Sequence, residues 1–152
     1  MVAPAVPQVL IEAGSSWSYL ANSSDPGIEN SWITEAFDAT AWSSGSYGIG
    51  YENDSGAGNL LQTTVPVDTR SIYTRSSFTI TDISSISKVT LGVDYDDGYI
   101  AWINGKEVFR SAVMPSGTPD WDANPGLLGV VTGKAGCLDP PPWRPADLAR
   151  IM

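Results

Sequence analysis

Two tryptophans have neighbours that suit the binding of a sugar ring. Trp102 lies in an alternating apolar run, and Trp121 lies in a polar stretch between Asp120 and Asp122. An indole is a flat apolar plate that can stack on the C–H face of a pyranose. We therefore predict that both tryptophans bind carbohydrate. The alternatives are that a loop buries Trp102 and that Trp121 is a lid over one end of the domain.

Further side chains that can bind sugar hydroxyls occur in the Gly/Ser/Asn-rich segment 43–58 and in the run 89–110. Tyrosine combines an apolar face with a hydroxyl, whereas carboxylates and amides supply hydrogen-bond acceptors and donors. The residues predicted to contact carbohydrate beside the two tryptophans are Tyr47, Tyr51, Asn53, Asp94 and Glu107. For segment 43–58 the alternative is an ordered loop whose tyrosines plug the end of the domain.

Carboxylates gather around one expected turn, at Asp94, Asp96 and Asp97. Calcium prefers several oxygen ligands in a flexible geometry, so this turn is a candidate site for a structural calcium ion. Aspartate also favours turns because it bonds its own backbone, and ordinary turn chemistry is the alternative. A looser second candidate for calcium consists of Asp120, Asp122 and Asn124.

The composition excludes several classes of function. The 152 residues carry a net charge of −9, so we expect neither a nucleic acid nor a membrane as partner. Without histidine there is no Ser-His or Cys-His pair, and a zinc site has few ligands to draw on. Carboxylate pairs can hydrolyse glycosides, but no pair here is distinguished by its spacing. We therefore expect no enzymatic activity. A single cysteine, Cys137, rules out an intrachain disulfide.

The elements that position these residues are clearest in the run 89–110. Asn104-Gly105 between apolar alternations predicts a type I′ hairpin turn. If Asp96, Asp97 and Gly98 form a three-residue loop, the alternating apolar residues before and after the loop lie on the same face. The predicted core face then carries Val89, Leu91, Val93, Tyr95, Tyr99, Ala101, Ile103 and Val108. The opposite face carries Thr90, Gly92, Asp94, Ile100, Trp102, Glu107 and Phe109.

The remaining chain reads as short strands separated by turns. We predict strands at 9–11, 17–20, 73–80 and 127–131, one helical turn within 32–42, and a long loop at 43–58. This spacing is typical of an all-β protein, an antiparallel β-sandwich. Proline-rich composition marks residues 1–8 as a linker and residues 134–152 as a C-terminal tail or linker, which leaves 9–133 as one domain.

An ordered series of motifs resembles a known family. The motifs are Trp17-Ser18-Tyr19, Trp32, the segment from Phe37 to Trp42, Gly45, the segment from Gly48 to Tyr51, Tyr73-Thr74-Arg75, Phe78, Asp96-Asp97-Gly98 and the segment from Ile103 to Val108. Together they resemble the galactose-binding-like β-sandwich domains of large secreted bacterial enzymes, many of which are carbohydrate-binding modules with a jelly-roll fold. The turn and hairpin are also similar to the lectin domain first named from anthrax protective antigen, in which an Asp-Asp pair holds calcium. That similarity implies calcium at Asp96 and Asp97.

The resemblance implies a secreted, extracellular bacterial module attached to a catalytic domain that degrades polysaccharide. With the acidic composition, it favours a neutral plant polysaccharide, a β-glucan such as cellulose, mixed-linkage glucan or xyloglucan. The alternative is a structural or protein-interaction spacer of a secreted surface protein. The chain departs from the family pattern at its end, where no segment matches the usual closing core strand. An uncovered edge would favour a dimer or a domain swap.

Overall fold

The computed structural model describes residues 8–12, 14–52, 58–95, 98–123 and 133–134, and in these ranges the protein is all-β. The described strands are β1 (Ser16–Asn22), β2 (Ser43–Ser46), β3 (Ile49–Gly50), β4 (Thr63–Thr64), β5 (Ser71–Arg75), β6 (Asp94–Tyr95), β7 (Ile100–Ile103), β8 (Lys106–Arg110) and β9 (Gly133–Lys134). Three short 3-10 helices join them within the same ranges, η1 (Ser31–Ile33), η2 (Gly58–Leu60) and η3 (Ile83–Ser85).

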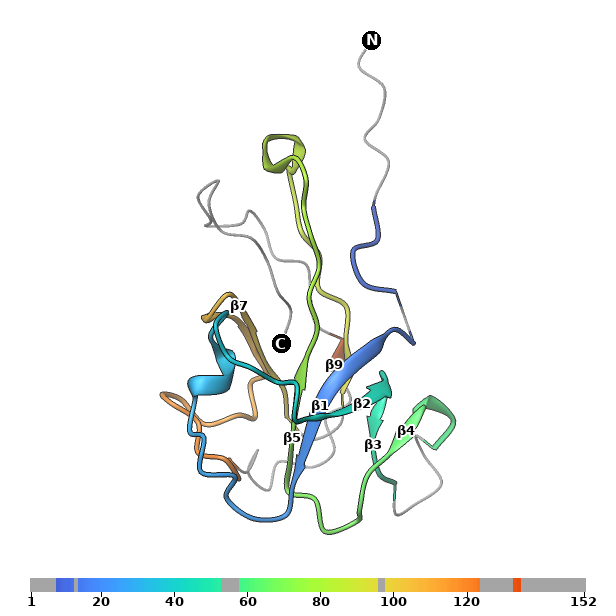
Figure 1. Ribbon diagram of the computed structural model, residues 1–152, viewed down its shortest axis with the longest axis vertical. Coiled ribbons are helices and arrows are strands. Elements are labelled where there is room, and N and C mark those ends of the chain that lie inside the picture. Colours follow the sequence, from blue (N-terminus) through green and yellow to red (C-terminus); the bar gives the residue numbers. More distant parts are fainter. Residues whose placement is uncertain (1–7, 13, 53–57, 96–97, 124–132, 135–152) are drawn as a thin grey trace.

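The central sheet has the order β2-β1-β5 and is antiparallel throughout (Figure 1). Trp17 of β1 lies opposite Gly45 of β2. A Cβ on Gly45 would come within 2.6 Å of the Thr63 hydroxyl oxygen, so only glycine lets β2 pass this close to β4. Three two-stranded pairs complete the described sheets: parallel β3-β4, and antiparallel β6-β9 and β7-β8.

The hairpin of β7 and β8 confirms the turn predicted from Asn104-Gly105. Both residues have positive φ, 49° and 80°, and Ile103 pairs directly with Lys106. A register shift between Ala101 and Trp102 places Phe109 opposite Ala101. The prediction that Phe109 lies on the same face as Trp102 is therefore wrong, because a bulge breaks the strict alternation.

Several predicted elements differ from the observed ones. Residues 9–11 form no strand, and the strand expected at 73–80 is β5, which begins at Ser71 and ends at Arg75. The expected loop 43–58 contains β2 and β3 in its described part, because the small residues there fit between β1 and β4. The helical turn predicted within 32–42 is η1, which lies at Ser31–Ile33. The expected strand at 127–131 lies outside the described residues, and β9 straddles the boundary predicted between domain and tail.

Apolar side chains form two core clusters on opposite faces of the β7–β8 hairpin. The first is centred on Trp32, Tyr73, Ile100 and Trp102. The second is centred on Leu91, Val93 and Ala101, with Tyr95, Tyr99, Val108 and Phe109 packed against it. The second cluster confirms most of the predicted core face. The first cluster shows that Ile100 and Trp102 are buried as well. This outcome agrees with the alternative in which another segment buries Trp102.

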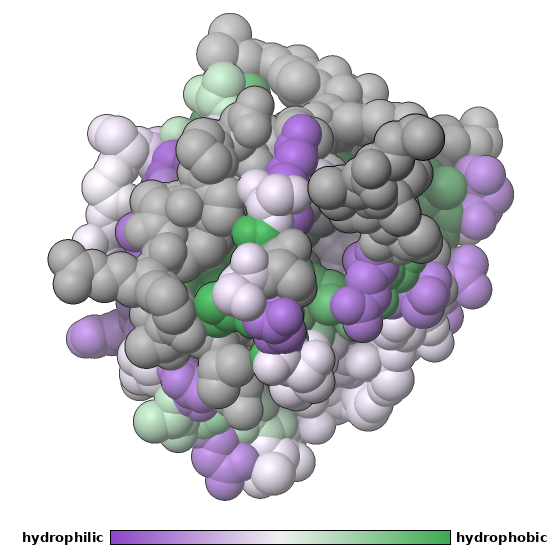
Figure 2. All heavy atoms as spheres, turned by 90° about the horizontal axis from the view of Figure 1, so that it is seen from above, coloured by the Kyte–Doolittle hydropathy of each residue, from purple (hydrophilic) through white to green (hydrophobic). Residues whose placement is uncertain are grey.

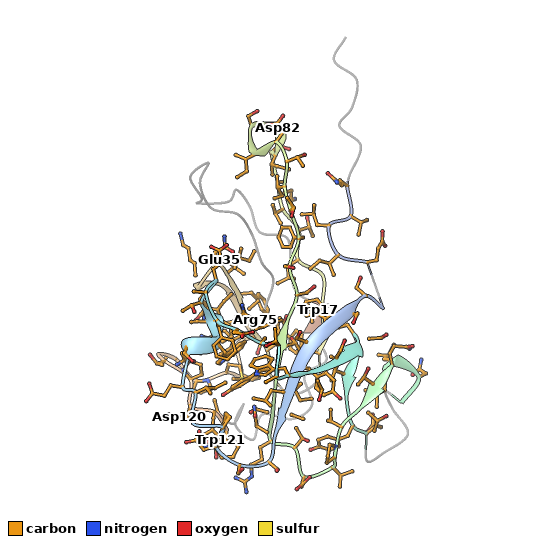
Figure 3. All side chains as sticks on the ribbon, in the orientation of Figure 1. Trp17, Glu35, Arg75, Asp82, Asp120 and Trp121 are labelled. Carbon is orange, nitrogen blue, oxygen red and sulfur yellow. The ribbon has the colours of Figure 1, made fainter. Side chains whose placement is uncertain are left out.

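A buried arginine fixes η1 and the residues after it to the central sheet. Arg75 is 7% exposed at the end of β5 and lies at the centre of Figure 3. Its guanidinium donates to the backbone carbonyls of Trp32, of Thr34 at 3.1 Å and of Phe37 at 3.4 Å. It also lies 5.4 Å from the centre of the Phe37 ring. Arg75 of the Tyr73-Thr74-Arg75 motif thus holds the segment that covers Trp102.

Beyond β5 the chain leaves the body of the molecule as a projecting arm, defined here as residues 76–90 (Figure 1). Asp82 at its tip caps η3 by accepting from the backbone N–H and the hydroxyl of Ser84, at 3.0 and 2.6 Å (Figure 3). Figure 2 looks down on this end of the molecule, where apolar residues show as small areas among polar ones. In Figure 1 the arm rises above the body of the molecule, whereas the segment 111–123, drawn in orange, lies at the lower left.

Candidate functional site

An open hollow of about 510 Å³ lies beside the β7–β8 hairpin. Its walls come from four parts of the chain: the η1 region, β7, β8 and the irregular segment after Arg110. The lining residues are Asn30, Ile33, Trp102, Glu107, Arg110, Ser116, Gly117, Thr118 and Pro119. Two of them, Trp102 and Glu107, were predicted from the sequence to contact carbohydrate, and they are Cα partners across the hairpin.

Trp102 forms part of the hollow's wall and does not present an open indole face. The residue is 6% exposed, and its ring meets the Trp32 ring edge to face, with centroids 5.4 Å apart and planes at 78°. Trp32 in turn stacks on Tyr73 at 4.3 Å. The prediction that Trp102 offers an exposed indole face to a sugar is therefore wrong, because Trp32 of η1 packs over this face of the hairpin.

Glu107 and Arg110 form the polar wall of the hollow. Arg110 Nε donates to Glu107 Oε1 at 2.8 Å and Nη2 donates to Oε2 at 2.6 Å, a bidentate pair. Arg110 Nη2 also donates to the Gly117 carbonyl at 2.9 Å, and Nη1 donates to the Pro115 carbonyl. Hydrogen bonding to Glu107 raises the pKa of Arg110. One side chain therefore connects β8 to the segment that forms the hollow's outer rim.

The hollow combines apolar and hydrogen-bonding surfaces in the way that a sugar requires. Ile33, Trp102 and Pro119 supply apolar wall, whereas Asn30 and Thr118 can hydrogen-bond through their side chains. Concave sites with mostly apolar walls and a few placed polar groups are the usual form of a small-ligand site. The arrangement offers both apolar contacts and hydrogen bonds to a small ligand.

The other predicted carbohydrate contacts lie elsewhere. Tyr47 packs on Trp17, with ring centroids 4.9 Å apart, and packs against the second core cluster. Tyr51 is exposed just after β3, and Trp121 packs against the first core cluster at the lower left of Figure 3. Asp94 belongs to β6, where its partner is Lys134. Asn53 lies outside the described residues.

The Tyr99 phenol is buried, and its titration is shifted by that burial. Burial raises the pKa of its phenol well above 10, and the neighbouring Tyr47 raises it further. Its ring is nearly parallel to that of Tyr95, with centroids 5.7 Å apart, and both pack against the second core cluster. Tyr95 and Tyr99 were both predicted to lie on the core face, and the contact between their rings agrees with that prediction. Tyr99 therefore belongs to the core and does not line the hollow.

The predicted calcium site falls mostly outside the described ranges, which do not include Asp96, Asp97 or Asn124. Among the residues that the structure describes, no group of three or more acidic, histidine or cysteine side chains is placed to hold a metal ion. Asp122 of the second candidate lies 3.6 Å from Arg70. Calcium therefore stays a prediction that rests on the carboxylates of this turn and on the sequence resemblance.

Sequence reasoning missed Asn30, Arg110, Ser116 and Thr118, which line the hollow beside the predicted residues. Glu107 and Arg110 are three residues apart on one strand, a spacing that places side chains on opposite faces of a regular strand. The bulge in the β7–β8 pairing lies in the same hairpin, and such irregularities re-aim side chains. No local pattern in the sequence predicts this bulge.

None of the family models, curated proteins or solved structures compared with the chain matches it. Within the described ranges, no helix is both long and apolar enough to cross a bilayer. The evidence for function thus comes from the hollow and from the composition.

Proposed function

We propose that the chain is a noncatalytic carbohydrate-binding module, a galactose-binding-like β-sandwich that binds neutral plant polysaccharide and targets an attached glycoside hydrolase. In this proposal the module is a secreted bacterial domain, and its ligands are β-glucans such as cellulose, mixed-linkage glucan or xyloglucan. The observation that carries the proposal is the hollow of about 510 Å³, in which Trp102 of β7 and Glu107 of β8 meet residues from two other segments, the η1 region and the segment after Arg110.

The size and composition of the hollow support a ligand of one to a few sugar units. Small-ligand sites have volumes of about 300–1,000 Å³. The apolar wall at Ile33, Trp102 and Pro119 would contact the C–H face of a sugar ring, and the amide of Asn30 and the hydroxyl of Thr118 would bind its hydroxyls. The net charge of −9 favours neutral over anionic chains.

A test of the proposal is to fill the hollow. Thr118 is exposed and lines the hollow, so Thr118→Trp should occupy the space and lower affinity at least about tenfold, a loss of roughly 1.4 kcal/mol. The control is Thr81→Trp, at an exposed position near the tip of the arm. Binding is measured by affinity electrophoresis on the soluble β-glucans, and by calorimetry with cello-oligosaccharides.

The outcomes distinguish an error in the location of the site from an error in the proposed function. If Thr118→Trp binds as tightly as the unchanged protein while sugar binding is present, the hollow is not the site. If no polysaccharide or oligosaccharide binds the unchanged protein, the carbohydrate-binding proposal is wrong.

A second candidate is a structural or protein-interaction spacer of a secreted surface protein. The observation in its favour is that Trp17, Trp32 and Trp102 are buried, whereas Trp42 and Trp121 are half-buried against the first core cluster. Among the described residues, then, every tryptophan is buried or half-buried. A spacer predicts no saccharide binding and weak quenching of tryptophan fluorescence by acrylamide.

A further inference from the structure

We propose that Glu107 determines the specificity of the hollow, because its carboxylate neutralises Arg110 and so keeps the hollow selective for neutral over acidic saccharides. Arg110 has the complementary role of a positioning residue that holds the rim. This inference rests on the proposed carbohydrate-binding function, and it identifies the pair of side chains that selects the class of sugar.

Glu107 already occupies the N–H groups of Arg110 that an acidic ligand would bind. Guanidinium binds a planar carboxylate through two parallel N–H groups, and Glu107 takes both of these positions at 2.8 and 2.6 Å. Each of the two Glu107 carboxylate oxygens accepts one of these hydrogen bonds. A ligand carboxylate would therefore compete with a carboxylate that is already in place.

The remaining contacts of Arg110 fix the rim of the hollow. The backbone carbonyls of Pro115 and Gly117 accept from its Nη1 and Nη2 atoms. With the two bonds to Glu107, four of the five N–H groups of the guanidinium have acceptors within the protein. Ser116 and Thr118, which flank Gly117, are thereby positioned as lining residues.

The pair controls the charge of the hollow. Among the nine residues that line it, Glu107 and Arg110 are the two that carry a charge, so their charges cancel. The Arg110 side chain is only 17% exposed and that of Glu107 is 38% exposed, so solvent screens the pair incompletely. Removal of the Glu107 charge would leave a positive hollow with a guanidinium fork available to a carboxylate.

The test compares two variants that each remove one negative charge. Glu107→Gln removes the charge from the hollow, and Glu12→Gln removes it from an exposed position before β1. For each protein, calorimetry gives the affinities for a cello-oligosaccharide and for an oligogalacturonate of the same length. We expect Glu107→Gln to raise the affinity ratio of acidic to neutral sugar by about tenfold or more, the effect of one new charge-assisted contact. The gain should diminish as salt is added.

Each outcome decides the inference. It is supported if Glu107→Gln raises the ratio and Glu12→Gln does not. It is overturned, with the proposed function intact, if both variants show the same acidic-to-neutral affinity ratio as the unchanged protein. It is also overturned if the unchanged protein already binds both sugars equally. If the unchanged protein binds neither sugar, the proposed function fails and the inference falls with it. Should Glu107→Gln not fold, Glu107→Thr removes the same charge with a residue that favours strands.

Discussion

The buried guanidinium of Arg75 provides the sharpest test of how η1 and the residues after it are held to the central sheet. Replacement of Arg75 by methionine keeps a long apolar stem but removes the donors that reach the carbonyls of Trp32, Thr34 and Phe37. The segment that covers Trp102 would lose these hydrogen bonds to β5 and keep the packing of Trp32 on Tyr73.

The size of the effect follows from these contacts. A hydrogen bond from a charged donor contributes about 1.5–3 kcal/mol, and the position of the guanidinium near the Phe37 ring adds about 0.5–1 kcal/mol. The methionine side chain restores part of the loss because it buries apolar surface. We therefore expect Arg75→Met to lower the free energy of unfolding by about 3 kcal/mol, with a fall in Tm of roughly 10 °C.

The assay is urea unfolding followed by tryptophan fluorescence, with Arg70→Met as the matched control. Arg70 has a side chain that is 65% exposed, and its nearest acidic partner, Asp122, lies 3.6 Å away. An exposed pair of this kind contributes little, so the control should unfold at the same urea concentration as the unchanged protein. Equal midpoints for Arg75→Met and Arg70→Met would refute the reasoning.

Two further predictions concern titration and metal binding. The raised pKa of Tyr99 means that the unfolded chain loses this proton first, so its contribution to stability is complete below about pH 10 and falls as the pH rises further. The urea midpoint of Tyr99→Phe should decline less between pH 9 and 11 than that of the unchanged protein, and identical slopes would argue against a perturbed phenol. If calcium binds at Asp96 and Asp97, a calcium concentration about a hundred times Kd should stabilise the protein by about 2.7 kcal/mol relative to an EDTA-treated sample. The double variant Asp96→Asn with Asp97→Asn should lose that gain, and no calcium effect on Tm would rule the site out.

Short-range features of the fold could be predicted because their causes are local. Asn104 and Gly105 adopt the positive φ values that a tight hairpin turn needs. The period-two spacing that puts Leu91, Val93 and Ala101 on one face predicted that these side chains share a core, and they do. In both cases the backbone period and the intrinsic preferences of neighbouring residues were sufficient.

Features that depend on distant segments were not predictable in the same way. The small residues of 43–58 read as a loop, but β1 and β4 supply the hydrogen-bond partners that make strands of Ser43–Ser46 and Ile49–Gly50. Trp102 had two interpretations from the sequence, and the position of Trp32 decides between them. The choice depends on Arg75, which fixes the η1 segment through backbone carbonyls that no side-chain pattern reveals.

The sequence by itself determined the all-β class, the Asn104-Gly105 hairpin and the acidic character of the surface, since these follow from local backbone preference, side-chain alternation and composition. It also singled out Trp102 and Glu107, although not that the two side chains lie at one hollow. Only the tertiary structure decided that they line one hollow with Asn30, Arg110 and Thr118. The physical reason is that a concave site requires walls from separate segments, and the packing of those segments is set by contacts between residues far apart in the chain.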